Sequence, residues 1–297
     1  MAGRYESHYV RAVDPDRPRG AWIRHTTLQR HGGPPATSFW CTAWDAAAGP
    51  PVTAKVTAPL AGAVFGTAGP DAAVVVRGEV PGRAAWDLRV APVTAPLRHL
   101  PHARLYAAPL PRTKLESPAP AARVSGTVRA GDRELTLGDW PGMAGHNWGA
   151  QHAETWLWLH GIGFEGAPGA WLDLAVGRVR IAGRTTPWIA NGALELDRGR
   201  RVRLGGLRAR VEVDATPAAA TVRLGATVVR VAAPPGQSVA WVYADPPGGE
   251  HHALNCSIAR IEVEHDGHAL ASPHGGVYEL GTRERDHGVP VAPFPDP

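Results

Sequence analysis

The chain has 297 residues, 44% of them hydrophobic and 20% charged, a composition that predicts a globular protein with a sizeable core and excludes a disordered chain. Its net charge is +4, and nearly all of its basic residues are arginines, because Lys55 and Lys114 are the two lysines. The arginines are scattered or alternate along apparent strands, which is typical of a solvated sheet face, so we expect no nucleic-acid partner.

The sequence has no long apolar run. Its first twenty residues lack the apolar centre of a secretory signal, and no window approaches the roughly 18 apolar residues of a membrane span. We therefore expect a cytoplasmic protein that does not cross a membrane, with peripheral contact left open. Cys41 and Cys256 form no metal-ligand spacing, and in a reducing compartment they are expected to be buried thiols.

Turn residues punctuate the chain from end to end, with 35 glycines and 29 prolines. Helical periodicity is absent, and short alternating segments recur between tight turns, which predicts an all-β sandwich or barrel. In chain order we expect a crossing strand at 110–120, a turn at 130–132, a strand at 134–137, a loop at 140–149, a turn at 197–199, strands at 207–213 and 260–264, a hairpin turn at 266–267, and an extended tail at 283–297.

The chain divides most naturally near residue 150. We expect an N-terminal barrel over residues 1–150 and a C-terminal barrel with the extended tail over residues 151–297. A weak duplication between these halves would not be visible in the sequence.

The most informative segment runs from Trp140 to His160, because it concentrates aromatic and ionisable side chains. Within it, His146 and Trp148 would project to one side of an extended backbone, with Asn147 between them and glycines at both ends that permit tight turns and close approach. An imidazole beside an indole suits proton transfer near an apolar substrate. The alternative is a structural plug, because tryptophans at alternate positions most often belong to a core.

The next residues alternate as a strand does. Glu154, Trp156, Trp158 and His160 would face one way and the intervening leucines the other, so the strand would be buried on both sides. We expect it to form a barrel wall whose inner face lines a cavity.

Asp173 stands within the apolar segment Ala170–Leu174, where a carboxylate is costly unless it is paired or hydrogen-bonded. As a general acid it would need a raised pKa, which burial supplies. Equally, Asp173 would serve as a structural acceptor of backbone or indole N–H groups.

Other ionisable groups carry less information. His251 and His252 follow Pro-Pro-Gly-Gly and are expected in an exposed loop, and His265 is expected to be solvated beside its turn. Glu279 is expected to be structural, paired with Arg283 or Arg285. None of these spacings is a recognised zinc set, so we predict no metal. Nucleotide-binding and serine-hydrolase loops are also absent.

Four stretches carry a family resemblance: 110–118, the HNWG block within 140–149, CSIA at 256–259 and YELG at 278–281. With them the chain resembles the lipocalin-like superfamily of AttH-like proteins, carotenoid hydratases, tocopherol cyclase-like proteins and lipocalin-like Diels-Alderases, and is most similar to AttH-like members. The resemblance implies two tandem lipocalin-like β-barrels, a ligand cavity in or between them, and no cofactor. A proposed functional His-x-Trp pair of the hydratases matches His146 and Trp148. Their Tyr-x-Asp pair matches Trp171 and Asp173, with Trp in place of Tyr.

These observations together predict a cofactor-independent hydratase, cyclase or isomerase that acts on a hydrophobic isoprenoid or polyketide-like molecule. The proton-handling candidates are His146, Asp173 and Glu154. The expected substrate-binding residues are Trp148, Trp156, Trp158, Trp171, Asn147 and His160. The alternatives are a non-catalytic carrier of hydrophobic ligands and a structural member without a pocket of about 300 Å³ or more.

Overall fold

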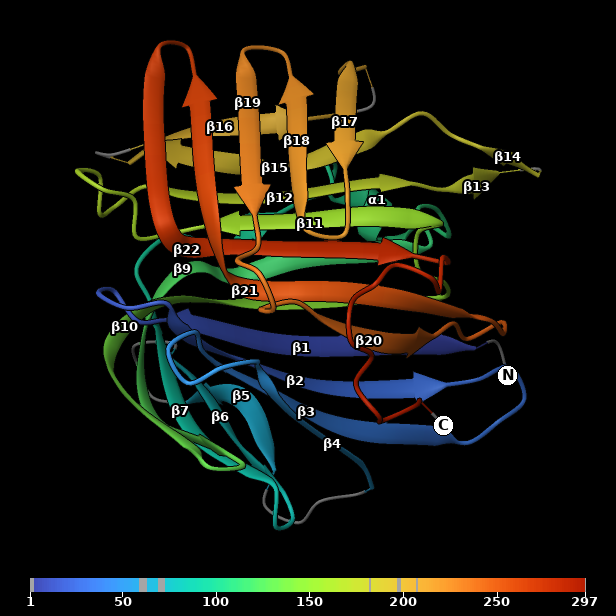
Figure 1. Cartoon of the computed structure of the whole chain (residues 1–297). Coiled ribbons are helices and arrows are strands. Elements are labelled where there is room, and N and C mark those ends of the chain that lie inside the picture. Colours follow the sequence, from blue (N-terminus) through green and yellow to red (C-terminus); the bar gives the residue numbers. More distant parts are fainter. Residues whose placement is uncertain are drawn as a thin grey trace.

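A computed structural model describes residues 3–58, 63–68, 73–181, 183–196, 199–206 and 208–296. The protein is all-β, as the turn-rich alternating sequence predicts, and its strands form two large antiparallel sheets. The sheets are stacked on each other, with the first sheet below the second in Figure 1. One is a nearly closed barrel and the other a half-barrel, so the expected pair of barrels is confirmed.

The first sheet has the order β4-β3-β2-β1-β10-β9-β7-β6-β5, with β8 beside β9. A short helix, α1 (Arg104–Ala107), precedes β9. The strands are β1 (Arg4–Val13), β2 (Arg19–Gln29), β3 (Pro35–Asp45), β4 (Val52–Thr57), β5 (Val64–Ala68), β6 (Ala73–Val80), β7 (Ala84–Pro92), β8 (Leu97–Arg98), β9 (Thr113–Ala130) and β10 (Arg133–Gly149).

The second sheet has the order β16-β15-β12-β11-β22-β21-β19-β18-β17, with β20 beside β21. A small ribbon pairs β13 (Arg180–Ile181) with β14 (Arg184–Thr185). The other strands are β11 (Thr155–Gly161), β12 (Trp171–Arg178), β15 (Ile189–Leu196), β16 (Arg200–Gly205), β17 (Val211–Ala215), β18 (Ala219–Leu224), β19 (Thr227–Ala232), β20 (Val239–Ala244), β21 (Glu250–His265) and β22 (His268–Thr282).

Both sheets follow the same path. In each sheet, the strand that comes first in the chain pairs with the strand that comes last. An extra short strand, β8 or β20, pairs with the last strand but one, β9 or β21. The shared order reveals the duplication that the sequence hides. The last strand of the first sheet ends at Gly149, and the first strand of the second sheet begins at Thr155. This boundary lies close to the expected division near residue 150, and the division into two domains there stays a prediction.

Several local predictions are confirmed. Gly131 has a positive φ in the turn between β9 and β10, and Asp266 and Gly267 both have positive φ in the turn between β21 and β22. The segment 110–120 enters β9 at Thr113. Cys41 and Cys256 are buried and unpaired. No helix of the described ranges is long and apolar enough to cross a membrane.

Other local predictions are wrong or fall outside the described residues. The expected loop at 140–149 is the end of β10, where Gly145 and Gly149 serve close approach rather than a turn: a Cβ at either would overlap Tyr9 or the Arg112 carbonyl. The strand expected at 207–213 begins at 211, and residue 207, like the turn residues 197 and 198, lies outside the described part of the chain.

The two sheets meet through side chains on their facing sides. Along β1, Val10 and Ala12 enter the core of the first sheet, whereas Tyr9 and Arg11 alternate with them and contact the second sheet. Along β11, the leucines enter the core of the second sheet and the indole of Trp158 faces Tyr9. Both strands are therefore buried on both faces, as predicted for β11, but the indole face lies between the sheets and not inside a barrel.

Candidate functional site

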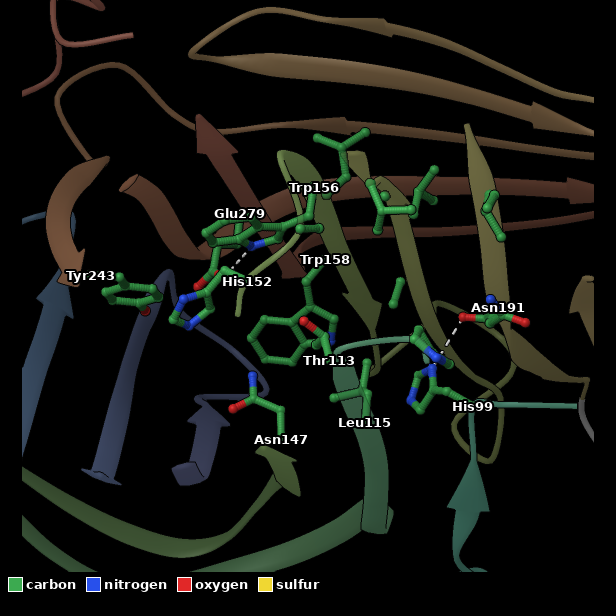
Figure 2. A pocket seen from close by; sticks show the side chains of 18 of the residues that line it. His99, Thr113, Leu115, Asn147, His152, Trp156, Trp158, Asn191, Tyr243 and Glu279 are labelled. Atoms are coloured by element: carbon green, nitrogen blue, oxygen red, sulfur yellow. Dashed lines mark hydrogen bonds between the residues drawn. The ribbon is translucent and has the colours of Figure 1, made fainter. Parts of the chain in front are cut away.

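A cavity of about 190 Å³ lies between the two sheets. Six aromatic side chains from four strands, and from both sheets, form much of its wall: Tyr5, Tyr9, Trp22, Trp156, Trp158 and Tyr243. Figure 2 shows three of them, Trp156, Trp158 and Tyr243. Their rings are fixed by contacts with each other and with histidines. Tyr9 packs edge-on to Trp158, with ring centroids 5.0 Å apart.

A second chamber of about 300 Å³ adjoins this cavity. Its lining includes the polar side chains of Gln151, Glu154 and Arg180. The inner cavity alone is smaller than typical ligand pockets, which begin at roughly 300 Å³, and the two chambers together reach that size. They share seven lining residues: Leu100, Pro111, Thr113, His152, Val179, Ile189 and Asn191.

Several polar groups of the inner cavity are held by the protein (Figure 2). Glu279 accepts a hydrogen bond from the Trp156 indole at 2.9 Å and another from Asn255 at 3.1 Å. His99 donates or accepts at both ring nitrogens, with Nδ1 3.1 Å from the Asn191 carbonyl. By contrast, Oδ1 of Asn147 is buried without a hydrogen-bond partner in the described residues.

Asp173 lies in the wall behind Trp158. Its carboxylate accepts hydrogen bonds from Ser117 at 2.5 Å and the Trp158 indole at 3.1 Å, and lies 3.3 Å from His99 Nε2. Burial raises its pKa, but His99, with help from His160 and Ser117, outweighs burial and lowers the pKa to about 2. The expected rise is therefore not found, and the indole N–H bond matches the structural interpretation.

His152 lines both chambers, and its ring stacks on that of Tyr5, with ring centroids 4.0 Å apart. Its Nδ1 lies 2.8 Å from Oδ1 of Asp245, a fully buried carboxylate. Asp245 also lies 3.1 Å from Arg283. Nε2 of His152 is buried and has no hydrogen-bond partner in the described ranges.

Four of the sequence-predicted residues line these chambers. Asn147, Trp156 and Trp158 line the inner cavity. Glu154 lines the outer chamber, where its carboxylate lies 3.3 Å from Arg283. Two of the six aromatic side chains of the cavity, Trp156 and Trp158, therefore come from the face of β11 that the alternation predicted to line a cavity.

His146 and Trp148 line neither chamber. They lie on the opposite face of β10 from Asn147, stacked on each other at 4.4 Å. His146 has Glu6 3.0 Å from Nε2 and Glu116 3.4 Å from Nδ1. The structure therefore does not bring His146 into one cavity with a carboxylate, because the alternation that points Asn147 inward points its neighbours outward.

Trp171 and His160 also lie outside both chambers. Trp171 is fully buried, with the Arg201 guanidinium 4.9 Å from its ring. His160 is buried between the sheets, where it contacts Arg11 and Pro120.

Two clusters in the described residues have ligand atoms close enough to hold a metal ion, within 4.8 Å of one another. One is Glu6, His8 and His146, and the other is His152, Asp245 and His251. In the second cluster, Arg283 already places a positive charge on Asp245, which disfavours a cation there.

Sequence reasoning missed His99 and His152 as residues of the site, and several of its other expectations about polar side chains are wrong. His251 and His252 are buried within β21, and His265 is also buried, so the expected exposed loop and solvated turn are wrong. Glu279 pairs with Trp156 and Asn255, not with an arginine. The partners come from distant strands, so no local pattern could have joined His152 to Asp245, which are 93 positions apart.

This fold defines a class: all-β proteins of two tandem barrel domains, here with a cavity between the two sheets. No protein-family model matches the sequence, and no curated protein matches it. A solved structure does match, that of a "putative AttH" from Nitrosomonas europaea, with 17% sequence identity and a TM-score of 0.60 over 94% of this chain and 92% of that chain. The protein thus has an AttH-like fold, as its sequence motifs predicted.

Proposed function

We propose that the protein binds a hydrophobic small molecule in the cavity between its sheets and converts it without a cofactor, as a hydratase, cyclase or isomerase. The observation that carries this proposal is the cavity lining: six aromatic side chains surround a few polar groups, among them the unpartnered Oδ1 of Asn147. Such a mixture of apolar walls and convergent polar groups is typical of small-molecule sites.

The aromatic walls suit carbocation chemistry. When a proton adds to an alkene, the electron pair of the double bond forms the new C–H bond and leaves a cation on the neighbouring carbon. Water or a second double bond then attacks the cation, or a proton leaves. Trp156, Trp158 and Tyr9 would offer ring faces to that cation, and their packing would exclude stray water.

The substrate class follows from the two chambers. An isoprenoid or polyketide-like molecule would place its apolar part in the inner cavity and a polar end toward Gln151, Glu154 and Arg180 in the outer chamber. Glu154 remains a candidate proton donor there. The catalytic roles of His146 and Asp173, and the binding roles of Trp148, Trp171 and His160, remain sequence-based predictions, which their positions outside the chambers do not favour.

The test uses the apolar fluorophore aminoanthracene as a probe. We expect saturable binding, displacement by members of an isoprenoid and polyketide panel, and loss of binding in Ala175→Trp, which fills the inner cavity. Ala269→Trp adds the same side chain at an exposed position and should bind normally. Failure of the wild-type protein to bind the probe or any panel member would overturn the proposal.

A non-catalytic carrier is the second candidate, because His99, Asn191 and Glu279 are all tied to protein partners. Native mass spectrometry of protein purified from its own host would identify a co-purifying ligand. Incubation with that ligand or its precursor then separates the two functions: an enzyme changes the bound mass or releases a product, whereas a carrier returns the ligand unchanged.

A further inference from the structure

Asp245 fixes the tautomer of His152. Its Oδ1 accepts hydrogen bonds from both the backbone N–H of His152, at 3.0 Å, and the ring Nδ1, at 2.8 Å. Burial raises the pKa of Asp245, but the hydrogen bonds and charge of His152 outweigh burial and lower it. Because an ionised carboxylate only accepts, Nδ1 of His152 carries a proton whether the ring is charged or neutral, and Nε2 of the neutral ring carries a free lone pair.

That lone pair is unused by the protein. Nε2 of His152 is buried and has no hydrogen-bond partner in the described part of the chain, although the side chain lines both chambers. The ring is held in orientation by Tyr5, stacked at 4.0 Å, and by Trp156 at 5.6 Å. His99, the other histidine of the inner cavity, has neighbours at both nitrogens. A buried polar atom without a protein partner is expected to meet a ligand.

We propose that Nε2 of His152 is the group that exchanges a proton with the substrate, and that Asp245 positions the ring and stabilises its protonated form. This inference rests on the proposed function, since it needs a ligand in the inner cavity. The pair has the geometry of a general base oriented by a carboxylate. Neither residue matches a motif on which the family resemblance rests.

The reaction that this pair supports is balanced without a co-reactant. Nε2 takes a proton from carbon, and the electron pair of that C–H bond forms a new double bond. The electrons of the old double bond then capture the proton from the imidazolium at another carbon, which regenerates neutral His152. Isomerisation therefore needs no further reagent.

Nitrobenzisoxazole is a suitable probe of a base in an apolar pocket. Removal of its C–H proton breaks the N–O bond and gives a coloured phenolate, so the rate reports proton abstraction directly. We expect saturable acceleration over free imidazole by the wild-type protein, and a loss of roughly 100-fold or more in His152→Gln. Asp245→Asn should lower the rate and shift its pH profile, because the ring loses its fixed tautomer.

The matched control is His265→Gln. His265 is also buried, with Nδ1 2.8 Å from Thr227 and Nε2 3.4 Å from Asp266, but lines neither chamber. Its loss should leave the rate unchanged. Titratable and charged groups near His152 and Asp245 are Tyr5, Tyr243, His251 and Arg283, and Glu154 pairs with Arg283. All of them are left unchanged in these variants, so the pH profiles are directly comparable.

Aminoanthracene binding is measured for every variant, to separate folding from chemistry. A wild-type protein that binds the fluorophore but does not accelerate the reaction overturns the inference and leaves the proposed function standing. Normal turnover in His152→Gln, or a rate that disappears with a chelator and returns with zinc, also overturns it. Absence of fluorophore binding by the wild type overturns the proposed function itself, and the inference with it.

Discussion

The indole of Trp156 covers Gly281, its direct partner on β22, so closely that a Cβ on that glycine would overlap the ring. Tyr9 covers Gly145 on β10 in the same way. Two walls of the cavity are thus aromatic rings laid over glycines of a neighbouring strand, an arrangement that fixes ring orientation in β-sheets.

Gly281→Ala should therefore displace Trp156 and break its hydrogen bond to Glu279. We expect a loss of about 1–3 kcal/mol in the free energy of unfolding, the usual cost of overpacking, together with weaker aminoanthracene binding. Urea denaturation and fluorescence titration measure the two effects. Gly66→Ala, where nothing lies within 4 Å of the added Cβ, is the control. Equal behaviour of the two variants would contradict the assigned role of Gly281.

Arg11 and His160 hold the two sheets together. The Arg11 guanidinium donates to Nδ1 of His160 at 3.0 Å and to the carbonyls of Gly275 and Ser257, and His160 donates from Nε2 to the Pro120 carbonyl at 2.8 Å. His160→Ala should cost about 3 kcal/mol or more, because a buried charge loses a partner and a cavity forms. Urea denaturation tests this, and a cost below about 1 kcal/mol would show that the contact contributes little.

Three buried histidines should make the fold sensitive to mild acid. The pKa values of His25, His160 and His251 are lowered to about 4, and burial is the largest cause in each case. Between pH 6.5 and 4 the unfolded chain takes up protons that the folded protein does not, so stability falls as pH decreases through this window. Above it these groups contribute no pH dependence. We expect a loss of up to about 3 kcal/mol for each histidine, measured by urea denaturation at successive pH values, whereas a flat profile would refute the prediction.

The sequence predicted the fold well because alternation and turn chemistry are local. The paired Asp266 and Gly267 specify their hairpin, and the alternation of β11 specifies which side chains share a face. The sequence did not reveal which face meets the other sheet. His146 and Asn147 are neighbours, yet only Asn147 lines the cavity, and that choice depends on how two separately folded sheets pack.

The sequence also did not reveal the electrostatic surroundings of Asp173. Burial of Asp173 was predictable from its apolar neighbours, but the direction of its pKa was not. His99, directly after β8, and Ser117, in β9 of the other sheet, help to lower that pKa and are 74 and 56 positions away. Long-range partners of this kind follow from the packing of the whole fold.

Asp173→Asn separates the two roles that the sequence left open for this residue. The ionised carboxylate accepts from Ser117 and the Trp158 indole, so its replacement should cost about 2 kcal/mol of stability. Because its folded pKa is lowered to about 2, its stabilising effect is present above pH 4 and is lost as pH falls toward 2, and this acid-induced loss should be absent in the variant. Thermal or urea denaturation at neutral and acid pH measures both effects. Unchanged stability with abolished proton transfer to nitrobenzisoxazole would instead assign Asp173 to catalysis.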